Sequence, residues 1–489
     1  MKEHEFFESH RRGFTALVEI ERNQQDSEGG WVTFDCFSVT PTWQRHRHRE
    51  EFDLLALRVS FASVAQLFPA IGESEGRWVK IEVTSQATTR ESISAEVVMF
   101  GDNAETVTLH IAHVSSVNLN SRENELFRLI GARRSPASLI AGVLDFSLSA
   151  AKGLAIAAYD VGQGNCNAIV DEYEHPRVFF DLGWAPNFHR HTRPLLQPDF
   201  FSCDSLTTAP VVLSHWDMDH WAYAIARSEY DPANLTTRHV WNVGALNRFW
   251  IARAPETEHH HIGPLAQSFY KALEKVRLLP GLPAILLWPE KCQRIRFSDG
   301  WLEACEPAPS LARDRNNTGI AMFVRPKGRG PAILMTGDAD FPSIPSLKSN
   351  TRLQLAGMVA PHHGSRITAG DVPKPMAGSP KTLVISVGHG NTYGHPKQDS
   401  IDAYEAAGWN GTVVLTRDRQ VCDRTCLPIH EHNHGNILLK FSTRTKDPRC
   451  GCGMVSEGNL CLVPSSVPIV APVPGIKKVR RRKTKAVVT

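Results

Sequence analysis

The chain lacks the features that mark secreted and membrane proteins. Its opening segment, Met1 to Arg12, is charged and holds no apolar core of a signal peptide. Its most apolar window, Ser138 to Tyr159, is interrupted by Asp145 and Lys152 and is unsuited to crossing a bilayer. The ten cysteines are scattered over 489 residues rather than concentrated as in small disulfide-rich domains. We therefore expect a soluble protein of the cytoplasm with no membrane span.

The chain also has little net charge. Its 54 Lys and Arg residues against 51 Asp and Glu leave a net charge of +3, which excludes a protein that is basic all over. Local basic segments remain, namely Arg45 to Arg49 beside Trp43 and the run between Lys477 and Lys485. Each is either a phosphate-binding patch or a solvated segment. Any contact with nucleic acid must therefore be local.

Length and texture divide the chain into three parts, because 489 residues are too many for one ordinary core. Residues 1–150 show strand-like alternation, as at Val79, Ile81 and Val83, and predict a β-rich N-terminal domain that recognises a substrate or a protein partner. Residues 154–445 alternate apolar strands with helical stretches and form the catalytic candidate. Residues 446–489 form an irregular tail that contains cysteines and basic residues.

The most informative segment runs from His215 to His220, where His215, Asp217, Asp219 and His220 place four metal-ligand side chains within six positions. The apolar residues 211–214 before it predict a buried strand, so the cluster lies where a strand ends. Imidazoles mixed with carboxylates suit Zn²⁺ or Mn²⁺, and the spacing differs from that of a helical HExxH site. Alternate strand residues can face one metal while the adjacent Asp and His turn toward a second. The alternative is ordinary surface exposure.

Two further strands end in ligand-type residues. Thr336, Gly337 and Asp338 follow the apolar residues 332–335, and the segment Pro361-His362-His363-Gly364-Ser365 follows residues 358–360. Strand ends on one edge of a sheet are where side chains from distant segments converge. We therefore expect Asp338 and His362 near the 215–220 segment.

Taken in order, these motifs resemble the metallo-β-lactamase-fold hydrolases and, more narrowly, the soluble hydrolase domain attached to bacterial competence DNA-uptake channels. The resemblance covers roughly residues 154–445. It rests on seven ordered motifs: Asp160 to Gly164, Phe180 to Gly183, His215 to His220, Asn316 to Gly319, Thr336 to Asp338, His362 to Ser365, and Ser386 to Gly388 with Asn391 and Tyr393 to Pro396.

The resemblance implies an α+β fold, in which an αββα sandwich carries a site for two Zn or Mn ions beside the additional β-rich domain. His215 and Asp217 would hold one metal and Asp219 and His220 the other. Asp338 would bridge the two ions and His362 would complete the second. His395 would face the substrate phosphate or add a ligand. The supporting positions would be Asp181, Gly162, Gln163, Gly164 and Ser365.

Two departures from the family pattern stand out. Asn165 occupies a position where the competence-type hairpin carries Asp, which removes a charge from the rim of the site. No clear counterpart exists for the histidine that many of these enzymes place before the bridging Asp. His239 and the triplet His259, His260 and His261 lie in that interval, and exposed loop histidines are the expected reading.

The expected chemistry is hydrolysis. Two ions would bind a bridging water and lower its pKa toward neutrality. Asp219 would orient the hydroxide, and His395 or His363 would protonate the leaving oxygen, unless His363 only orients its neighbour. We therefore expect a phosphodiesterase or nuclease acting on DNA or RNA. The alternatives are a hydrolase of a small ester, lactone or β-lactam, and a metal-bound scaffold without catalysis.

A second metal site is conceivable near the C-terminus, where cysteines and histidines crowd together. A structural zinc and free thiols in a loop are equal alternatives, because the spacing matches no familiar zinc motif. The residues concerned are Cys422, Cys426, His430, His432, His434, Cys450, Cys452 and Cys461.

Overall fold

The structure is a computed structural model, and strands account for 35% and helices for 24% of the residues that it describes. The described residues are 11–22, 29–39, 52–87, 92–101, 105–194, 198–201, 208–255, 260–307, 315–349, 353–409, 412–418, 420–421 and 433–441.

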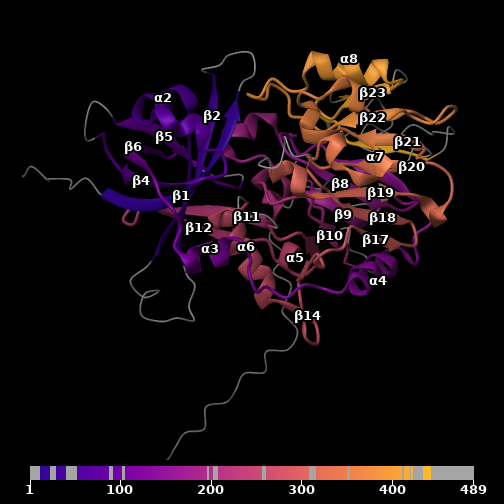
Figure 1. Cartoon of the computed structure of the whole chain (residues 1–489), viewed down its shortest axis with the longest axis horizontal. Helices are drawn as coiled ribbons and strands as arrows, with labels where there is room; N and C mark the ends of the chain where they lie inside the picture. The colour runs from indigo at the N-terminus through magenta and orange to yellow at the C-terminus, as the bar shows by residue number, and fades with distance from the viewer. Residues whose placement is uncertain are drawn as a thin grey trace, which may run out of the picture.

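The first part of the chain folds into a closed six-stranded antiparallel barrel. The hydrogen-bonded order β3-β2-β1-β4-β6-β5 closes because β5 also pairs with β3. In Figure 1 the barrel is the indigo body on the left. Two strands of a later segment, β11 (Ile225–Asp231) and β12 (Thr236–Trp241), extend this sheet through β3. The barrel strands are β1 (Arg11–Arg22), β2 (Gly30–Val39), β3 (Phe52–Ser60), β4 (Trp78–Thr84), β5 (Ile93–Val97) and β6 (Thr108–Ser116).

The side chains of strand β1 face the inside and the outside of the barrel in turn. Phe14, Ala16 and Val18 point into the barrel and join its core, as expected from the two-residue period of a strand. Leu17 points the other way and joins a different core cluster. Glu19 and Glu21 share the parity of Leu17, so they lie on the outer face of the barrel.

A first seven-stranded sheet follows, with the order β16-β13-β10-β9-β8-β7-β26. Every residue of β8 and β9 is buried, so both faces of these strands are covered. The strands are β7 (Ala155–Ala158), β8 (Cys166–Val170), β9 (Pro176–Leu182), β10 (Val211–Val212), β13 (Trp250–Ala252), β16 (Ile285–Leu287) and β26 (Ile437–Leu439).

A second seven-stranded sheet has the order β17-β18-β19-β20-β21-β22-β23. One buried cluster contains Phe180 and Val212 of the first sheet together with Met322 and Met335 of the second, so the two sheets face each other across it. The strands are β17 (Arg294–Phe297), β18 (Gly300–Ala304), β19 (Ile320–Val324), β20 (Ala332–Met335), β21 (Leu355–Val359), β22 (Thr382–Ile385) and β23 (Thr412–Leu415).

Helices and small hairpins complete the described structure. Helix α6 packs on the outer side of the first sheet through Leu265, Phe269 and Leu273, and α8 packs on the second through Ala403 and Tyr404. The helices are α2 (Phe61–Leu67), α3 (Ser121–Phe127), α4 (Ala137–Leu148), α5 (Val243–Leu246), α6 (Pro264–Lys275), α7 (Pro345–Ser349) and α8 (Gln398–Ala406). The small hairpins pair β14 (Arg277–Leu279) with β15 (Leu282–Pro283) and β24 (Gln420–Val421) with β25 (Asn433–His434).

The predicted αββα sandwich is wrong as a description of this fold. The chain is β-rich and contains a closed six-stranded antiparallel barrel. Barrel residues Leu17, Phe37 and Trp78 belong to the same buried cluster as Val211 and Trp250 of the first sheet. The barrel thus shares the face that the prediction assigned to a helical layer. The sequence motifs indicate where strands end. They do not indicate which elements cover the faces of the sheets, so this part of the fold could not be predicted from them.

Candidate metal-binding site

Four strands end beside one another and deliver the site residues. Asp181 lies in β9, and the segment from His215 to His220 follows β10. Asp338 follows β20, and His362 and His363 follow β21 in the 3-10 turn η9 (Pro361–Gly364). Three of these residues, Asp181, His362 and His363, have left-handed φ angles of 63°, 45° and 53°. Strained backbone of this kind concentrates at functional sites, where the surrounding fold holds it in place.

The carboxylate of Asp181 is the buried centre of a hydrogen-bond network. It is fully inaccessible and accepts hydrogen bonds from the backbone N of Ser214 at 2.7 Å, from Ser214 Oγ at 2.8 Å and from His220 Nδ1 at 2.8 Å. Asn165 Nδ2 donates to the same carboxylate at 3.2 Å. Asp181 therefore supports the site from beneath.

This network decides which imidazole nitrogens are left for a ligand. Since Nδ1 of His220 donates to Asp181, Nε2 is the nitrogen that a cation can bind in place of a proton. Ser214 Oγ donates to Asp181 and therefore accepts from His215 Nδ1 at 3.0 Å, which gives His215 the same tautomer. His363 Nδ1 donates to the carbonyl oxygen of Ser386 at 2.7 Å, so its Nε2 also faces the site. All three imidazoles are thus oriented as metal ligands.

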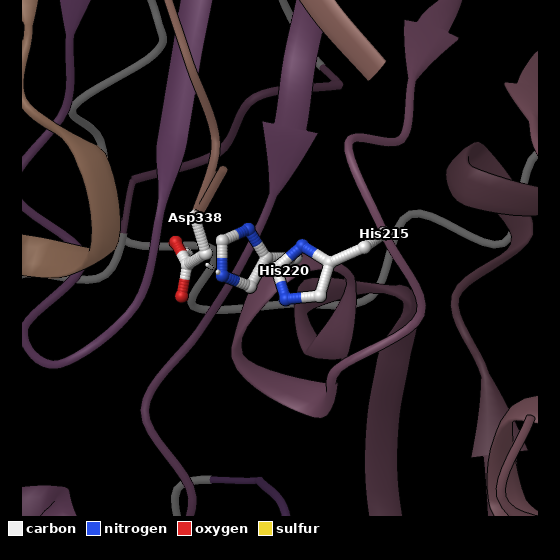
Figure 2. A group of neighbouring side chains, drawn as sticks. All are labelled: His215, His220 and Asp338. Atoms are coloured by element: carbon white, nitrogen blue, oxygen red, sulfur yellow. Dashed lines mark ion pairs between the residues drawn. The ribbon is translucent and has the colours of Figure 1, made fainter. Parts of the chain in front are cut away.

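His215, His220 and Asp338 form the first group able to hold a cation. One ligand atom of each residue lies within 4.8 Å of the other two (Figure 2), and all three residues are buried. His220 Nε2 and Asp338 Oδ1 lie 3.2 Å apart as an ion pair, and His215 Nε2 lies 3.4 Å from Asp217 Oδ2. None of the three atoms has a hydrogen bond of regular geometry. Buried polar atoms are normally hydrogen-bonded, so three that converge with only ion-pair contacts are suited to share a cation. Two imidazole nitrogens and a carboxylate oxygen fit Zn²⁺ or Mn²⁺.

Asp219, His220 and His363 form a second group of the same kind. His363 Nε2 lies 3.0 Å from Asp219 Oδ2, and His220 Nε2 lies 3.7 Å from Asp219 Oδ1. His220 belongs to both groups, and one imidazole nitrogen serves one ion. His362 is the outermost candidate, because its side chain is 40% exposed and its Nε2 lies 3.8 Å from Asp338 Oδ2.

Asp217 connects the site to the barrel. Its Oδ2 lies 3.4 Å from His215 Nε2, and its Oδ1 lies 3.3 Å from Arg315, which also pairs with Glu19 of β1 at 3.0 Å. Burial raises the pKa of Asp217, but Arg315 and then His215 outweigh burial and hold this pKa well below its usual range. Asp217 is therefore ionised and available as a ligand.

Charge is balanced within the metal-free site by mutual pairing. Burial raises the pKa of Asp338, but the imidazoles around it, His220 first, bring it well below the usual value. Burial lowers the pKa of His220, but Asp338 and then Asp219 raise it well above the ordinary value. The pKa of His363 is raised against the effect of burial, chiefly by Asp338. A binding cation would displace the imidazole protons and take over the same carboxylates.

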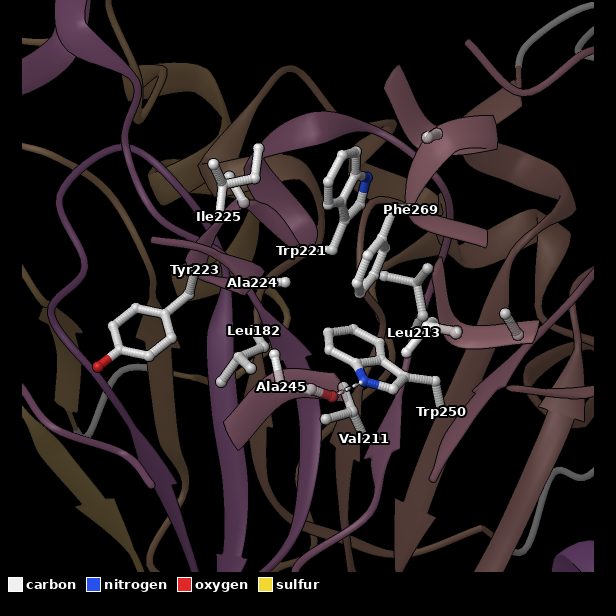
Figure 3. Close-up of a cluster of buried hydrophobic side chains, with 14 of the residues drawn as sticks. Leu182, Val211, Leu213, Trp221, Tyr223, Ala224, Ile225, Ala245, Trp250 and Phe269 are labelled. Atoms are coloured by element: carbon white, nitrogen blue, oxygen red, sulfur yellow. Dashed lines mark hydrogen bonds between the residues drawn. The ribbon is translucent and has the colours of Figure 1, made fainter. Parts of the chain in front are cut away.

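The segment from His215 to His220 is held in place by the core beneath it. Trp221 follows directly and stacks on Phe269 of α6 with ring centroids 5.0 Å apart, and Trp250 meets the same ring edge-on (Figure 3). Gly183 also allows the Asp219 backbone to lie close to the loop after β9. A Cβ atom at position 183 would lie 1.8 Å from the Asp219 carbonyl oxygen. The position of Asp219 therefore depends on a residue without a side chain.

The remaining predicted residues lie around a cavity of about 570 Å³. Gln163, Ser365 and His395 line it, together with the ligand candidates Asp217, Asp219, Asp338, His362 and His363. Gly162 and Gly164 flank Gln163 in the turn between β7 and β8. His395 is half-buried, and burial followed by His362 lowers the pKa of its imidazole to about 2. A neutral His395 suits hydrogen bonding to a substrate better than proton donation at neutral pH.

Other predicted positions lie away from the two groups. Asn165 is buried against Asp181 rather than at the rim, where an Asp would set two carboxylates against each other. His239 is in β12 and bonds Ser228 Oγ at 3.0 Å, and His261 packs edge-on against Trp78 of the barrel. His260 is buried outside both groups, and His259 lies outside the described residues.

The proposed C-terminal zinc site also lies outside the description. Its cysteines and His430 and His432 are among the residues that the structure does not describe, and of His434 only the backbone in β25 is described. This site stays a prediction.

Sequence reasoning missed several residues that line the cavity, above all Arg315, His189, Glu19 and Glu21. Arg315 directly precedes a recognised motif, and His189 lies in a histidine-rich segment between two of them, so both left a signal. Glu19 and Glu21 left no signal in the sequence, because the alternation in β1 does not reveal which part of the protein packs against the outer face of this strand.

A comparison of the chain with protein-family models finds no match, and a comparison with curated proteins finds none. No helix in the described part of the chain combines the length and apolar character required to cross a membrane.

Proposed function

We propose that the chain is a metal-dependent hydrolase that cleaves a phosphodiester bond. The observation that carries the proposal is the convergence of His215 Nε2, His220 Nε2 and Asp338 Oδ1, three buried ligand atoms that have no regular hydrogen bond. Divalent ions bound there would supply an activated water and neutralise charge that develops on the reacting phosphorus. The surrounding network favours function over chance, because it fixes the tautomer that a metal ligand needs.

The residues of the chain have distinct roles in this proposal. His215, His220 and Asp338 bind one cation, while Asp219 and His363 offer ligands for a second. The carboxylate of Asp219 also orients the attacking water. His395 contacts a substrate oxygen as a neutral hydrogen-bond donor, which its lowered pKa supports. Asp181 holds the imidazoles in register without touching the substrate.

Metal content and hydrolysis of bis-p-nitrophenyl phosphate in Mn²⁺ and Zn²⁺ test the proposal. We expect about two ions per chain in the folded protein, and turnover that a chelator abolishes. Asp219→Ala should reduce kcat by about a hundredfold or more, since positioned acid–base groups contribute this much. Asp402→Asn, an exposed change on α8, is the matched control and should leave kcat unchanged.

The outcome also distinguishes the alternatives. An enzyme that opens lactones while leaving every phosphodiester intact would show that the bond is wrongly assigned. A protein that holds metal and hydrolyses neither class would be a scaffold.

A further inference from the structure

Part of the wall of the cavity belongs to the barrel. Glu19, Glu21 and Thr33 line the cavity together with Asp338 and His363. Their position follows from strand geometry. Glu19 and Glu21 lie on the outer face of β1, and Thr33 of β2 is the residue paired with Glu19. The barrel is therefore part of the site.

The charges on this wall are already paired. Arg315 binds Glu19 at 3.0 Å and Asp217 at 3.3 Å, and Arg58 binds Glu21 at 3.2 Å. Among the described residues that line the cavity, Arg315 is the sole lysine or arginine, and two carboxylates engage it. Binding of a nucleic-acid strand draws much of its affinity from lysines and arginines that neutralise its phosphates. The cavity offers no such contact in its described part.

His189 supplies a different kind of contact. It lines the cavity, is 1% exposed, and neither Nδ1 nor Nε2 has a hydrogen-bond partner. Its ring lies among aromatic rings, 4.6 Å from that of Phe188 and 5.0 Å from that of Tyr393. Burial and then Arg58 lower the pKa of His189 to about 2, so the imidazole is neutral and offers one donor and one acceptor. The two nitrogens point in diverging directions, so a ligand in the cavity can satisfy one of them, as donor or as acceptor.

We propose that His189, Phe188 and Tyr393 form a substrate-binding subsite for an uncharged planar group that carries a hydrogen-bond donor or acceptor, so that the substrate is a small molecule and not a nucleic-acid strand. This inference rests on the proposed function for the scissile bond. The cavity of about 570 Å³ has the size of a small-molecule site. The planar group hydrogen-bonds to one nitrogen of His189 beside the aromatic side chains, while the ester lies at the ligand groups.

Binding of thymidine to the full chain tests the subsite without requiring turnover, because its neutral base carries an N–H between two carbonyls. We expect calorimetry to detect binding by the wild-type protein and about a tenfold or greater loss of affinity in His189→Phe. His189→Gln, which keeps a donor and an acceptor, should retain most of the affinity and control for misfolding. His191→Phe changes an exposed neighbour in the same 3-10 turn η2 (Asn187–Thr192) and should leave the affinity for thymidine unchanged.

A ten-nucleotide oligothymidylate should bind no more tightly than thymidine.

Turnover separates this inference from the proposed function. In the metal-loaded enzyme, kcat/KM for thymidine 5′-(p-nitrophenyl phosphate) should exceed that for methyl p-nitrophenyl phosphate, and His189→Phe should remove the preference. Failure of thymidine to bind, binding that survives His189→Phe, or tighter binding of the oligonucleotide would overturn the subsite, whatever the activity. Thymidine binding that depends on His189, with neither ester hydrolysed, would leave the subsite intact and refute the phosphodiesterase.

Discussion

At the scale of the residue, one buried carboxylate organises the candidate metal site. Asp181 touches no proposed cation, yet its hydrogen bonds to Ser214 and His220 determine the imidazole nitrogens that face inward. Removing its charge while keeping its shape separates this positioning role from metal binding itself.

We expect Asp181→Asn to lower zinc affinity by about tenfold to a hundredfold, as the loss of a carboxylate that orients a ligand histidine does elsewhere. With its NH2 group at the position of Oδ2, the amide presents N–H groups where the carboxylate accepted three bonds, so His220 loses the acceptor that fixes its orientation. Calorimetric zinc titration measures the effect, and circular dichroism checks the fold. Unchanged affinity would show that Asp181 is dispensable for the orientation of the imidazoles.

The imidazoles also set a pH dependence for the metal-free protein. The raised pKa values of His220 and His363 stabilise the fold fully below the ordinary value of about 6.5, and this contribution is lost as pH rises through the folded values. The lowered pKa values of Asp219 and Asp338 act at the acidic end, where their contribution is lost as pH falls.

Between about pH 6 and about pH 8, metal-free protein should therefore lose stability relative to zinc-loaded protein, because His220 and His363 give up their protons. The lowered pKa values of His189 and His395 favour the higher pH, and they act with and without zinc. Thermal melts with and without chelator measure the difference between the two forms. A change of Tm with pH that is the same in both forms would contradict the assigned charge states.

At the scale of the element, the loop after β9 and the segment after β10 meet at a contact that only glycine permits. Gly183→Ala places a methyl group on the Asp219 carbonyl oxygen, so one of the two segments must move. We expect a loss of about 1–3 kcal/mol in the free energy of unfolding, together with weaker metal binding. Gly142→Ala in helix α4 is the matched control, because a Cβ there meets nothing within 4 Å.

The control should stabilise the protein by about 0.5–1 kcal/mol, since alanine is the better helix former. Urea denaturation of both variants gives the comparison. Equal effects would show that the segment relaxes freely around position 183.

Sequence reasoning succeeded for local features and failed for long-range ones. The apolar runs before His215, Asp338 and His362 predicted strands, and β10, β20 and β21 are found there. The covering of the sheets was predicted wrongly, because the pairing of β11 and β12 with the barrel joins residues far apart in the chain. Glu19 could not be linked to Arg315, since that ion pair spans almost three hundred positions.

At the scale of the whole molecule, Arg58 joins the barrel to the loops of the site. Its buried guanidinium lies 4.1 Å from the Trp31 ring and 4.0 Å from the Phe188 ring, pairs with Glu21, and donates to Thr392 Oγ1 at 3.1 Å. Barrel strands and site loops therefore share one cation, and the two parts are expected to stabilise each other.

We expect Arg58→Met to lower the free energy of unfolding by about 3–5 kcal/mol, because it leaves Glu21 without its buried partner. Arg227→Met, which breaks the exposed pair with Glu229 at 2.9 Å, should cost less than about 1 kcal/mol. Chemical denaturation followed by tryptophan fluorescence measures both. Similar losses in the two variants would argue that Arg58 does not hold the barrel to the site.

The alternation of β1 has one more consequence. The same strand directs Ala16 and Val18 into the barrel and Glu19 and Glu21 toward the cavity. The core and the cavity wall therefore depend on the same two-residue alternation. Inserting one amino acid between Val18 and Glu19 would turn both glutamates inward and present apolar side chains to the ligand. Evolution can exchange individual side chains on this strand, but it cannot change the length of the strand there without rebuilding the barrel and the specificity together.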